Sequence, residues 1–182
     1  STLQPGQIIE TLASNCDGSV ITVQSGTYTF PNITVKQHCN NITHPGDLLT
    51  GSNISYKPPP GTKRVIYEFN YQVDRGPGGH YNSHLSFLIA GNEILNARST
   101  VAEYIGMGTL VNFKFIINCD VSSTDYTKGH INNWTDLKEL KIFICTFSNA
   151  GYAIMMHDTT HWVGAYDVNG GLAFHVPNLQ IT

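Results

Sequence analysis

The feature that most constrains the fold is a strand-like run that follows three consecutive prolines. Five apolar or aromatic residues recur at every second position of this run: Val65, Tyr67, Phe69, Tyr71 and Val73. The positions between them are polar except for Ile66. A period of two over this length predicts a long β-strand with one face buried and one in solvent. Prolines 58–60 cannot donate to a sheet ladder, so they are expected to form a rigid corner before the strand.

The rest of the chain supplies the further strands that such a sheet needs. Turn residues such as Gly91-Asn92 separate short apolar or alternating segments. After the first long strand, strands are expected over residues 84–90, 93–98, 109–118, 137–147, 152–157, 160–165, 172–176 and 179–182. No segment is convincingly helical. The pattern predicts an all-β fold, in which two antiparallel sheets form a jelly-roll sandwich.

Composition agrees with an all-β chain and excludes some partners. Charged residues make up only 13% of the 182 residues, and the formal net charge is −3. There is no run of Lys or Arg, so nucleic acid is not an expected partner. No apolar segment approaches the roughly 18 residues that span a bilayer, so membrane insertion is not expected.

Three segments are predicted along the chain. Residues 1–36 hold short β segments with too little apolar mass for a core, so they form a short N-terminal β extension, an attachment or stem segment. Its partner could be the main domain, sister chains or a larger assembly. Residues 37–51 are polar and are predicted as a linker loop, and residues 52–182 form the jelly-roll domain.

The segment 137–147 is apolar on both faces, whereas a two-sheet sandwich buries only one face of each strand. The second face therefore needs a cover. Another subunit is the favoured cover, and loops of the same chain are the alternative.

The cysteines and histidines give no metal or cofactor signature. Cys16, Cys39, Cys119 and Cys145 form no CxxC pair, and buried free thiols are favoured over a disulfide. In the run 157–161, His157 and His161 would lie roughly 13 Å apart on an extended strand, too far to share an ion. A bend there would permit a His/Asp/His site, but hydrogen-bonded histidines are favoured.

Catalysis is not expected either. The serines lack a GxSxG context, and nothing marks a pair among the acids Glu68, Glu93, Asp120 and Asp125. The candidate binding residues lie instead in or beside loops that could face a receptor or a glycan: Arg75, His80, Tyr81 and Tyr126. Four Asn-X-Ser/Thr sequons, at Asn32, Asn41, Asn53 and Asn133, occur at nearly the chance frequency for this composition.

Several motifs, in order, resemble a family of structural proteins of marine viruses and phages that carry a TNF-like jelly-roll domain. They cover nearly the whole chain, at residues 9–12, 16–18, 23–29, 54–69, 83–87, 91–94, 113–118, 134–135, 140–142, 161–162 and 174–182. Their order is more specific than any one of them.

The resemblance implies a homotrimeric fibre, spike or head-decoration component at the virion surface, without catalytic residues. Its expected partners are its own copies, other virion proteins and a host-surface glycan or receptor. Two other classes stay open. One is a lectin-type binding module that acts alone, and the other is a jelly-roll hydrolase or cupin-like enzyme.

Overall fold

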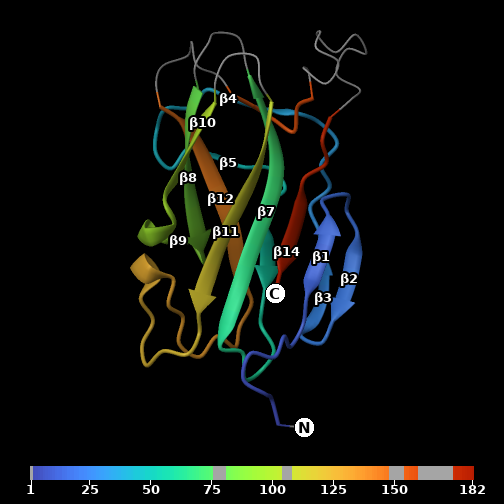
Figure 1. The fold of residues 1–182 in the computed structure, drawn as a ribbon, viewed down its shortest axis with the longest axis vertical. Helices are drawn as coiled ribbons and strands as arrows, with labels where there is room; N and C mark the ends of the chain where they lie inside the picture. The colour runs from blue at the N-terminus through green and yellow to red at the C-terminus, as the bar shows by residue number, and fades with distance from the viewer. Residues whose placement is uncertain (1, 76–80, 104–107, 148–153, 160–173) are drawn as a thin grey trace.

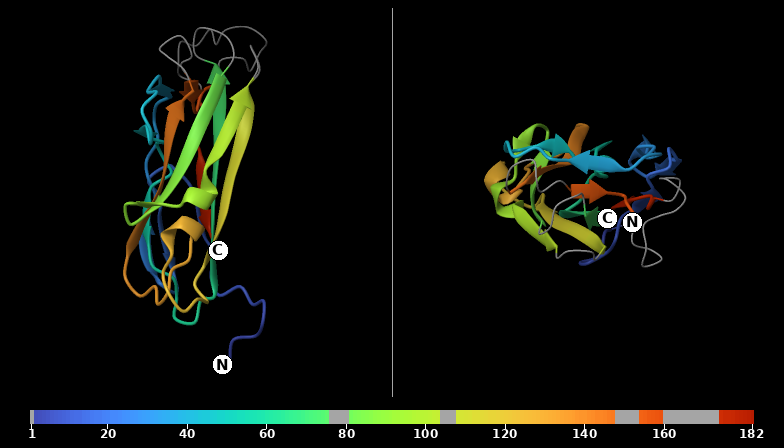
Figure 2. Two further views of the ribbon diagram at one scale, coloured as in Figure 1. Left: turned by 90° about the vertical axis from the view of Figure 1, so that its left-hand side faces the viewer. Right: turned by 90° about the horizontal axis from the view of Figure 1, so that it is seen from above.

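The computed structural model describes residues 2–75, 81–103, 108–147, 154–159 and 174–182. The side chains of Arg75, Tyr81 and Glu103 are not among the described parts. The described chain is almost entirely β, and its antiparallel strands form the two predicted sheets, packed as layers (Figures 1 and 2). The elements are β1 (Leu12–Asn15), β2 (Val20–Val23), β3 (Gly26–Thr29), β4 (Gln37–Cys39), β5 (Asp47–Leu48), β6 (Ile54–Tyr56), β7 (Arg64–Arg75), β8 (Tyr81–Ile89), β9 (Asn92–Glu93), η1 (Leu95–Ala97), β10 (Ser99–Glu103), β11 (Thr109–Asn118), η2 (Tyr126–Lys128), β12 (Lys138–Thr146), β13 (Ile154–Met156) and β14 (Asn178–Ile181).

Strand order identifies the sandwich as a jelly roll. In the first sheet β11 pairs with β7, whose other edge pairs with β14 and then β13; β1 continues from β14, and β4 from β13. In the second sheet the order is β10, β8 and β12, with β5 and β6 sharing the far edge of β12.

Short strands that lie end to end in a sheet can be counted as one strand: β1 with β4, β5 with β6, and β13 with β14. With the β2–β3 hairpin and the short β9 left out, this gives eight strands. Numbered in chain order, they lie as 1-8-3-6 in the first sheet and 2-7-4-5 in the second. This interleaving, in which every chain reversal crosses between the sheets except the one from β8 to β10 within the second sheet, is the jelly-roll arrangement. It confirms the fold class that the sequence predicts.

The long strand β7 forms the centre of the core, as its alternation predicts. Its five inward residues, Val65 to Val73 at every second position, are all buried, while the outward residues from Arg64 to Gln72 are partly or fully exposed. Tyr67 stacks across the sandwich on Phe87 of β8, with ring centroids 4.8 Å apart. Its hydroxyl donates to the carbonyl of Ser52 at 2.5 Å, so the one polar atom of this buried ring is paired.

The N-terminal third is built into this sandwich. β1 pairs with β14, β4 with β13 and β5 with β12, while β2 and β3 form a separate hairpin. Leu12, Phe30 and Cys39 belong to the same buried cluster as β7. The division at residues 36 and 51 stays a prediction, but strands from each of the first two predicted segments pair with strands of the third.

One predicted strand is wrong in part. Residues 93–98 begin as β9 but continue as the 3-10 turn η1, and a strand that was not predicted, β10, follows. Ile94 and Ala97 are both buried, and the Ala97 amide donates to the Ile94 carbonyl at 3.0 Å. A spacing of three between buried residues suits one 3-10 turn rather than a strand. The predicted strand 160–165 and most of 172–176 lie outside the described residues.

The second face of β12 is largely covered by the chain itself. Leu48 of β5 lies beside Phe143, and the β4–β5 loop packs so closely that a Cβ on Gly46 would come within 2.8 Å of the Cys145 Cβ. Phe143 is half-buried and Cys145 is buried. Of the apolar residues on this face, Leu137 and Phe147 at its two ends remain in solvent, with 62% and 69% of their surfaces exposed. The alternative cover, loops of the same chain, therefore accounts for most of this face.

Candidate functional site

The predicted binding residues do not converge in the described structure. Arg75 ends β7 and Tyr81 begins β8, so both lie at the end of the sandwich that is uppermost in Figure 1. His80 lies outside the described residues. Tyr126 belongs to η2 at the opposite end, where its half-buried ring packs against the core. Whether any of the four contacts a ligand stays a prediction.

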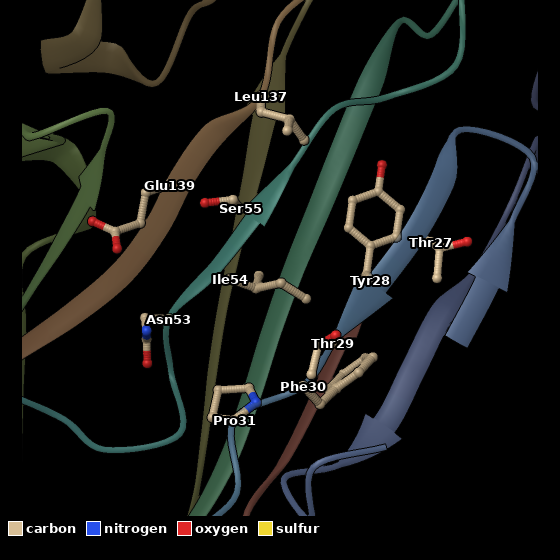
Figure 3. Close-up of a pocket in the computed structure, with 10 residues that line it drawn as sticks. All are labelled: Thr27, Tyr28, Thr29, Phe30, Pro31, Asn53, Ile54, Ser55, Leu137 and Glu139. Carbon is tan, nitrogen blue, oxygen red and sulfur yellow. The ribbon is translucent and has the colours of Figure 1, made fainter. Parts of the chain in front are cut away.

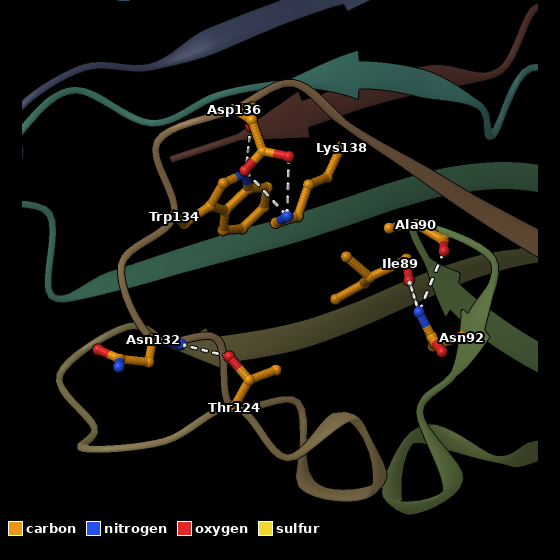
Figure 4. A network of polar contacts seen from close by, with 8 residues as sticks. All are labelled: Ile89, Ala90, Asn92, Thr124, Asn132, Trp134, Asp136 and Lys138. Carbon is orange, nitrogen blue, oxygen red and sulfur yellow. Dashed lines mark hydrogen bonds and ion pairs between the residues drawn. The ribbon is translucent and has the colours of Figure 1, made fainter.

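The loop that carries Tyr126 is held by polar contacts rather than being an open binding loop. The Asn132 amide donates to Thr124 Oγ1 at 3.1 Å, and Trp134 Nε1 donates to the Asp136 carbonyl at 2.9 Å. Lys138 Nζ then donates to Asp136 Oδ2 at 3.0 Å (Figure 4). These contacts fix the chain between the buried Trp134 ring and the start of β12.

One surface cleft lies between the β2–β3 hairpin and strand β6. It has a volume of about 420 Å³, and Figure 3 shows the side chains around it. Its lining comes from both sides: Thr27, Tyr28, Thr29, Phe30 and Pro31 from the hairpin side, and Asn53, Ile54, Ser55, Leu137 and Glu139 from the sheet. The hydroxyls, the amide and the carboxylate make this a hydrogen-bonding cleft with an apolar floor.

Tyr28, which lines this cleft, is held by contacts with neighbouring residues. The Tyr28 hydroxyl donates to the Lys57 carbonyl at 3.0 Å, and its ring lies 5.4 Å from that of Tyr56. Glu10 accepts from the Tyr56 hydroxyl at 2.7 Å. The sequence does not predict this cleft, because its two sides come from segments 22 or more positions apart and share no motif. Asn53 stands out in the sequence only as part of a sequon.

The second cleft, of about 380 Å³, lies on the outer face of the second sheet. Its lining includes His44, His84, Ser86, Arg98, Thr100 and Cys145. Arg98 donates twice to Glu93, at 2.8 and 3.0 Å, and His44 Nε2 lies 3.2 Å from the same carboxylate. The hydrogen bond from Arg98 lowers the pKa of Glu93, so the carboxylate stays ionised and neutralises the guanidinium.

The chemistry of the second cleft does not favour a nucleophile. Burial raises the pKa of the Cys145 thiol, and the Asp47 carboxylate raises it further. The reactive form of a cysteine is the thiolate, which such surroundings disfavour. His84, its neighbour across the strands, shares a hydrogen bond with Thr100 Oγ1 at 3.1 Å.

The His157-Asp158 pair is structural. His157 Nε2 lies 3.0 Å from the Thr50 carbonyl and 2.9 Å from Thr50 Oγ1, and Asp158 pairs with Lys36 Nζ at 2.6 Å. His161 lies outside the described residues. Among the residues that the structure describes, no three His, Cys, Asp or Glu side chains gather as a metal site would require.

All four cysteines are free thiols. Burial raises the pKa of Cys16 to about 12 and those of Cys39 and Cys119 to about 11. They act as small apolar groups of the interior. Within the described chain, no helix has the length and apolar character to cross a membrane.

No protein-family model matches the chain, and no curated protein matches it. Among solved structures, the chain is similar to one described as the infectious bursal disease virus Gx strain, with a TM-score of 0.42 and 9% identity over 100% of this chain and 40% of that one. The VP2 subviral particle of infectious bursal disease virus gives a TM-score of 0.37 and 12% identity, over 90% of this chain and 42% of that one. The chain is therefore less than half as long as these neighbours. At such scores the likeness carries no argument about function.

Proposed function

We propose that the chain is a non-enzymatic structural component of a virion surface, a decoration, fibre or spike, that assembles as a homotrimer. The resemblance of its ordered motifs to virion structural proteins supports the role, and the jelly-roll sandwich is a rigid scaffold suited to it.

The observation that carries the assembly is apolar surface left in solvent around β12. Phe147, just after the strand, is 69% exposed, and Leu137, just before it, is 62% exposed. At about 25 cal/mol per Å², burying a few hundred Å² per subunit contributes several kcal/mol. A second copy is the expected source of that cover.

Light scattering at micromolar concentration tests the trimer. The expected mass is about 60 kDa, three times the 20.0 kDa of one chain, or a multiple of it where trimers associate further. Phe147→Asp should lower that mass because it would bury a charge, whereas Phe147→Leu should preserve it. A well-folded wild-type monomer would contradict the trimer.

In the assembled particle, the end of the sandwich near Arg75 and Tyr81 would face a host glycan or receptor, with several copies engaged at once. The opposite end of the sandwich would contact other virion proteins and so attach the protein to the particle. Replacing each of these two residues by alanine and measuring particle attachment to host cells tests this orientation. Unchanged attachment in both variants would reject it.

The second candidate is a lectin-type module that binds glycans on its own, and the cleft between β3 and β6 favours it. Thr27, Thr29, Asn53, Ser55 and Glu139 would offer hydroxyl, amide and carboxylate groups to sugar hydroxyls. A glycan array decides between the candidates. Binding by the wild type that is lost in Asn53→Ala, without a change of mass in solution, would favour the lectin.

A further inference from the structure

Within the part of the chain that the structure describes, strand β11 presents one unpaired edge over most of its length. It lies at the margin of its sheet, where β7 is the one described strand that pairs with it (Figure 1). The Cys119 amide donates to the Lys63 carbonyl, in line with this pairing, whereas the Asn118 amide turns away and donates to the Gly129 carbonyl. Main-chain groups alternate in direction along a strand, so the even-numbered residues of β11 direct theirs to the free edge.

Four residues form this edge: Leu110, Asn112, Lys114 and Ile116. All four are exposed or partly so, and Leu110 and Ile116 are 60% and 49% exposed. Below them, residues 129–131 occupy the edge at Asn118. Among the described residues, no main-chain or side-chain group bonds to the outward amides and carbonyls of the four. A long apolar edge of this kind is a template for another strand.

The side chains of this edge are complementary to those of a second, antiparallel copy of the same edge. In chain order they are apolar, amide, ammonium and apolar. An antiparallel copy centred on Phe113 would set Leu110 opposite Ile116 and Asn112 opposite Lys114. The spacing also places outward main-chain groups opposite outward main-chain groups, which is the condition for ladder hydrogen bonds.

We propose that β11 pairs antiparallel with β11 of a second copy, across a two-fold axis at Phe113, joining the first sheets of both copies. This contact would be one interface of the assembly proposed above. It rests on the proposed function only in that the assembly is taken to be part of a virion. Four residue pairs would each exchange two main-chain hydrogen bonds.

Charge selects this register over its neighbours. A two-fold axis at Lys114 would place two ammonium groups opposite each other, and an axis at Asn112 would place Leu110 opposite Lys114. In the proposed register, Lys114 instead faces Asn112, whose amide nitrogen already donates to Asn70 Oδ1 at 2.5 Å. The Asn112 oxygen is thus oriented to accept from the ammonium of the second copy. Like charges directly opposite are destabilising, so this register is favoured.

The occupant is a second copy because the edge matches itself. An unrelated strand would need its own matching order of apolar and polar groups at the same spacing. Two-fold pairing also closes the edge on itself, so growth stops at two copies along this direction.

A charge-exchange pair of variants tests the contact. Leu110→Glu with Ile116→Glu places like charges opposite each other at both ends, and we expect it to weaken self-association by about tenfold or more. Leu110→Lys with Ile116→Glu has the same number of charged substitutions but places opposite charges in contact. We expect it to restore association to within a few-fold of wild type.

Amide exchange gives a second measurement that does not depend on these substitutions. In the wild type, the amides of Leu110, Asn112, Lys114 and Ile116 should gain protection as concentration rises. Equal association by both double variants, or exchange at these amides that is independent of concentration, would overturn the pairing.

The mass in solution separates this contact from the trimer. If the Glu/Glu variant halves the wild-type mass, the edge contact stands, whether or not the remaining unit is the trimer of about 60 kDa. If the wild type is a trimer and the Glu/Glu variant has the same mass, the edge contact fails and the proposed trimer survives. A wild-type monomer at all concentrations would reject both.

Discussion

At the scale of single residues, the buried polar groups decide how conditions affect this fold. His157 is fully buried, and its Nε2 lies 3.0 Å from the Thr50 carbonyl. Burial lowers the pKa of His157 to about 4; the Thr50 contact opposes this lowering, and the nearby His175 adds to it slightly. The ring is therefore neutral in the folded protein at neutral pH.

Acid should destabilise the protein through His157. The unfolded chain takes up a proton near pH 6.5, whereas the folded ring does so only near pH 4. The unfolded state is therefore favoured progressively as pH falls between these values, and the loss levels off below pH 4. The difference between the two pKa values corresponds to about 3 kcal/mol of stability. Urea unfolding from pH 7 to pH 4 measures it.

His157→Gln should have a flatter stability profile over the same pH range, because it removes the titrating group. His84→Gln, on the outer face of the second sheet, is the matched control and should keep the wild-type profile. Equal slopes for His157→Gln and the wild type would show that another group dominates.

Ser52 is a second buried polar residue with a measurable role. Its hydroxyl donates to the Leu49 carbonyl at 2.6 Å and accepts from the Ile142 amide at 3.0 Å. Ser52→Ala would leave that buried amide unpaired, so we expect a loss of about 1–3 kcal/mol in the free energy of unfolding. Ser55→Ala, exposed on β6 nearby, should change it by less than about 0.5 kcal/mol. Similar losses in both variants would contradict the assigned role.

At the scale of elements, β7 and β11 closely match the strands that their sequence patterns predict, whereas the turns are determined by close contacts with other elements. Residues 109–118 form β11 as predicted, with Val111, Phe113 and Ile117 buried. η2, by contrast, ends at Gly129 in the left-handed region, against the Phe115 ring. No local pattern predicts that contact, because it joins a loop to a strand already formed.

Alanine substitutions at Gly129 and Gly91 distinguish the cost of backbone strain from the cost of a steric clash. Both have positive φ, of 71° and 78°, so an alanine at either costs about 1 kcal/mol for conformation alone. A Cβ at Gly129 would meet the Phe115 ring, whereas one at Gly91 meets nothing within 4 Å. We expect Gly129→Ala to cost a further 1–3 kcal/mol, roughly, from overpacking. Thermal unfolding compares them, and equal costs would mean that the ring moves aside freely.

At the scale of the whole molecule, the N-terminal strands make the sandwich one unit. β1 and β4 extend the first sheet beyond β13 and β14, and β5 adds to the second. Their removal would expose the edges of those strands and uncover the core around Tyr56 and Tyr67.

A truncated chain of residues 52–182 should therefore fail to form a cooperatively folded protein. Removal of residues 1–8 alone should have little effect, because residues 2–8 are largely exposed and lie outside the strands. Circular dichroism and tryptophan fluorescence during urea unfolding measure both. A truncated chain with the wild-type transition would establish residues 52–182 as an autonomous domain.

The candidate clefts were less predictable than the fold. Asn53 and Ser55 lie on one strand edge and Thr27 and Thr29 on another, with a cleft between them only because the β2–β3 hairpin docks beside β6. Likewise, His44 meets Glu93 and Arg98 because the β4–β5 loop crosses the outer face of the second sheet. Neither set of contacts has a local sequence signal, since each depends on the packing of segments that are far apart in the chain.

The sequence by itself determined the all-β class, the inward face of β7 and most of β11 and β12. Those features depend on alternation, which is local and is enforced wherever one face of a sheet is buried. Only the tertiary structure decided that β1, β4 and β5 complete the two sheets and that a loop of the same chain covers Phe143 and Cys145. It also decided that one edge of β11 has no partner strand among the described residues. These depend on which strand edges find partners, and a strand's period of two says which face is buried but not what lies beside its edge.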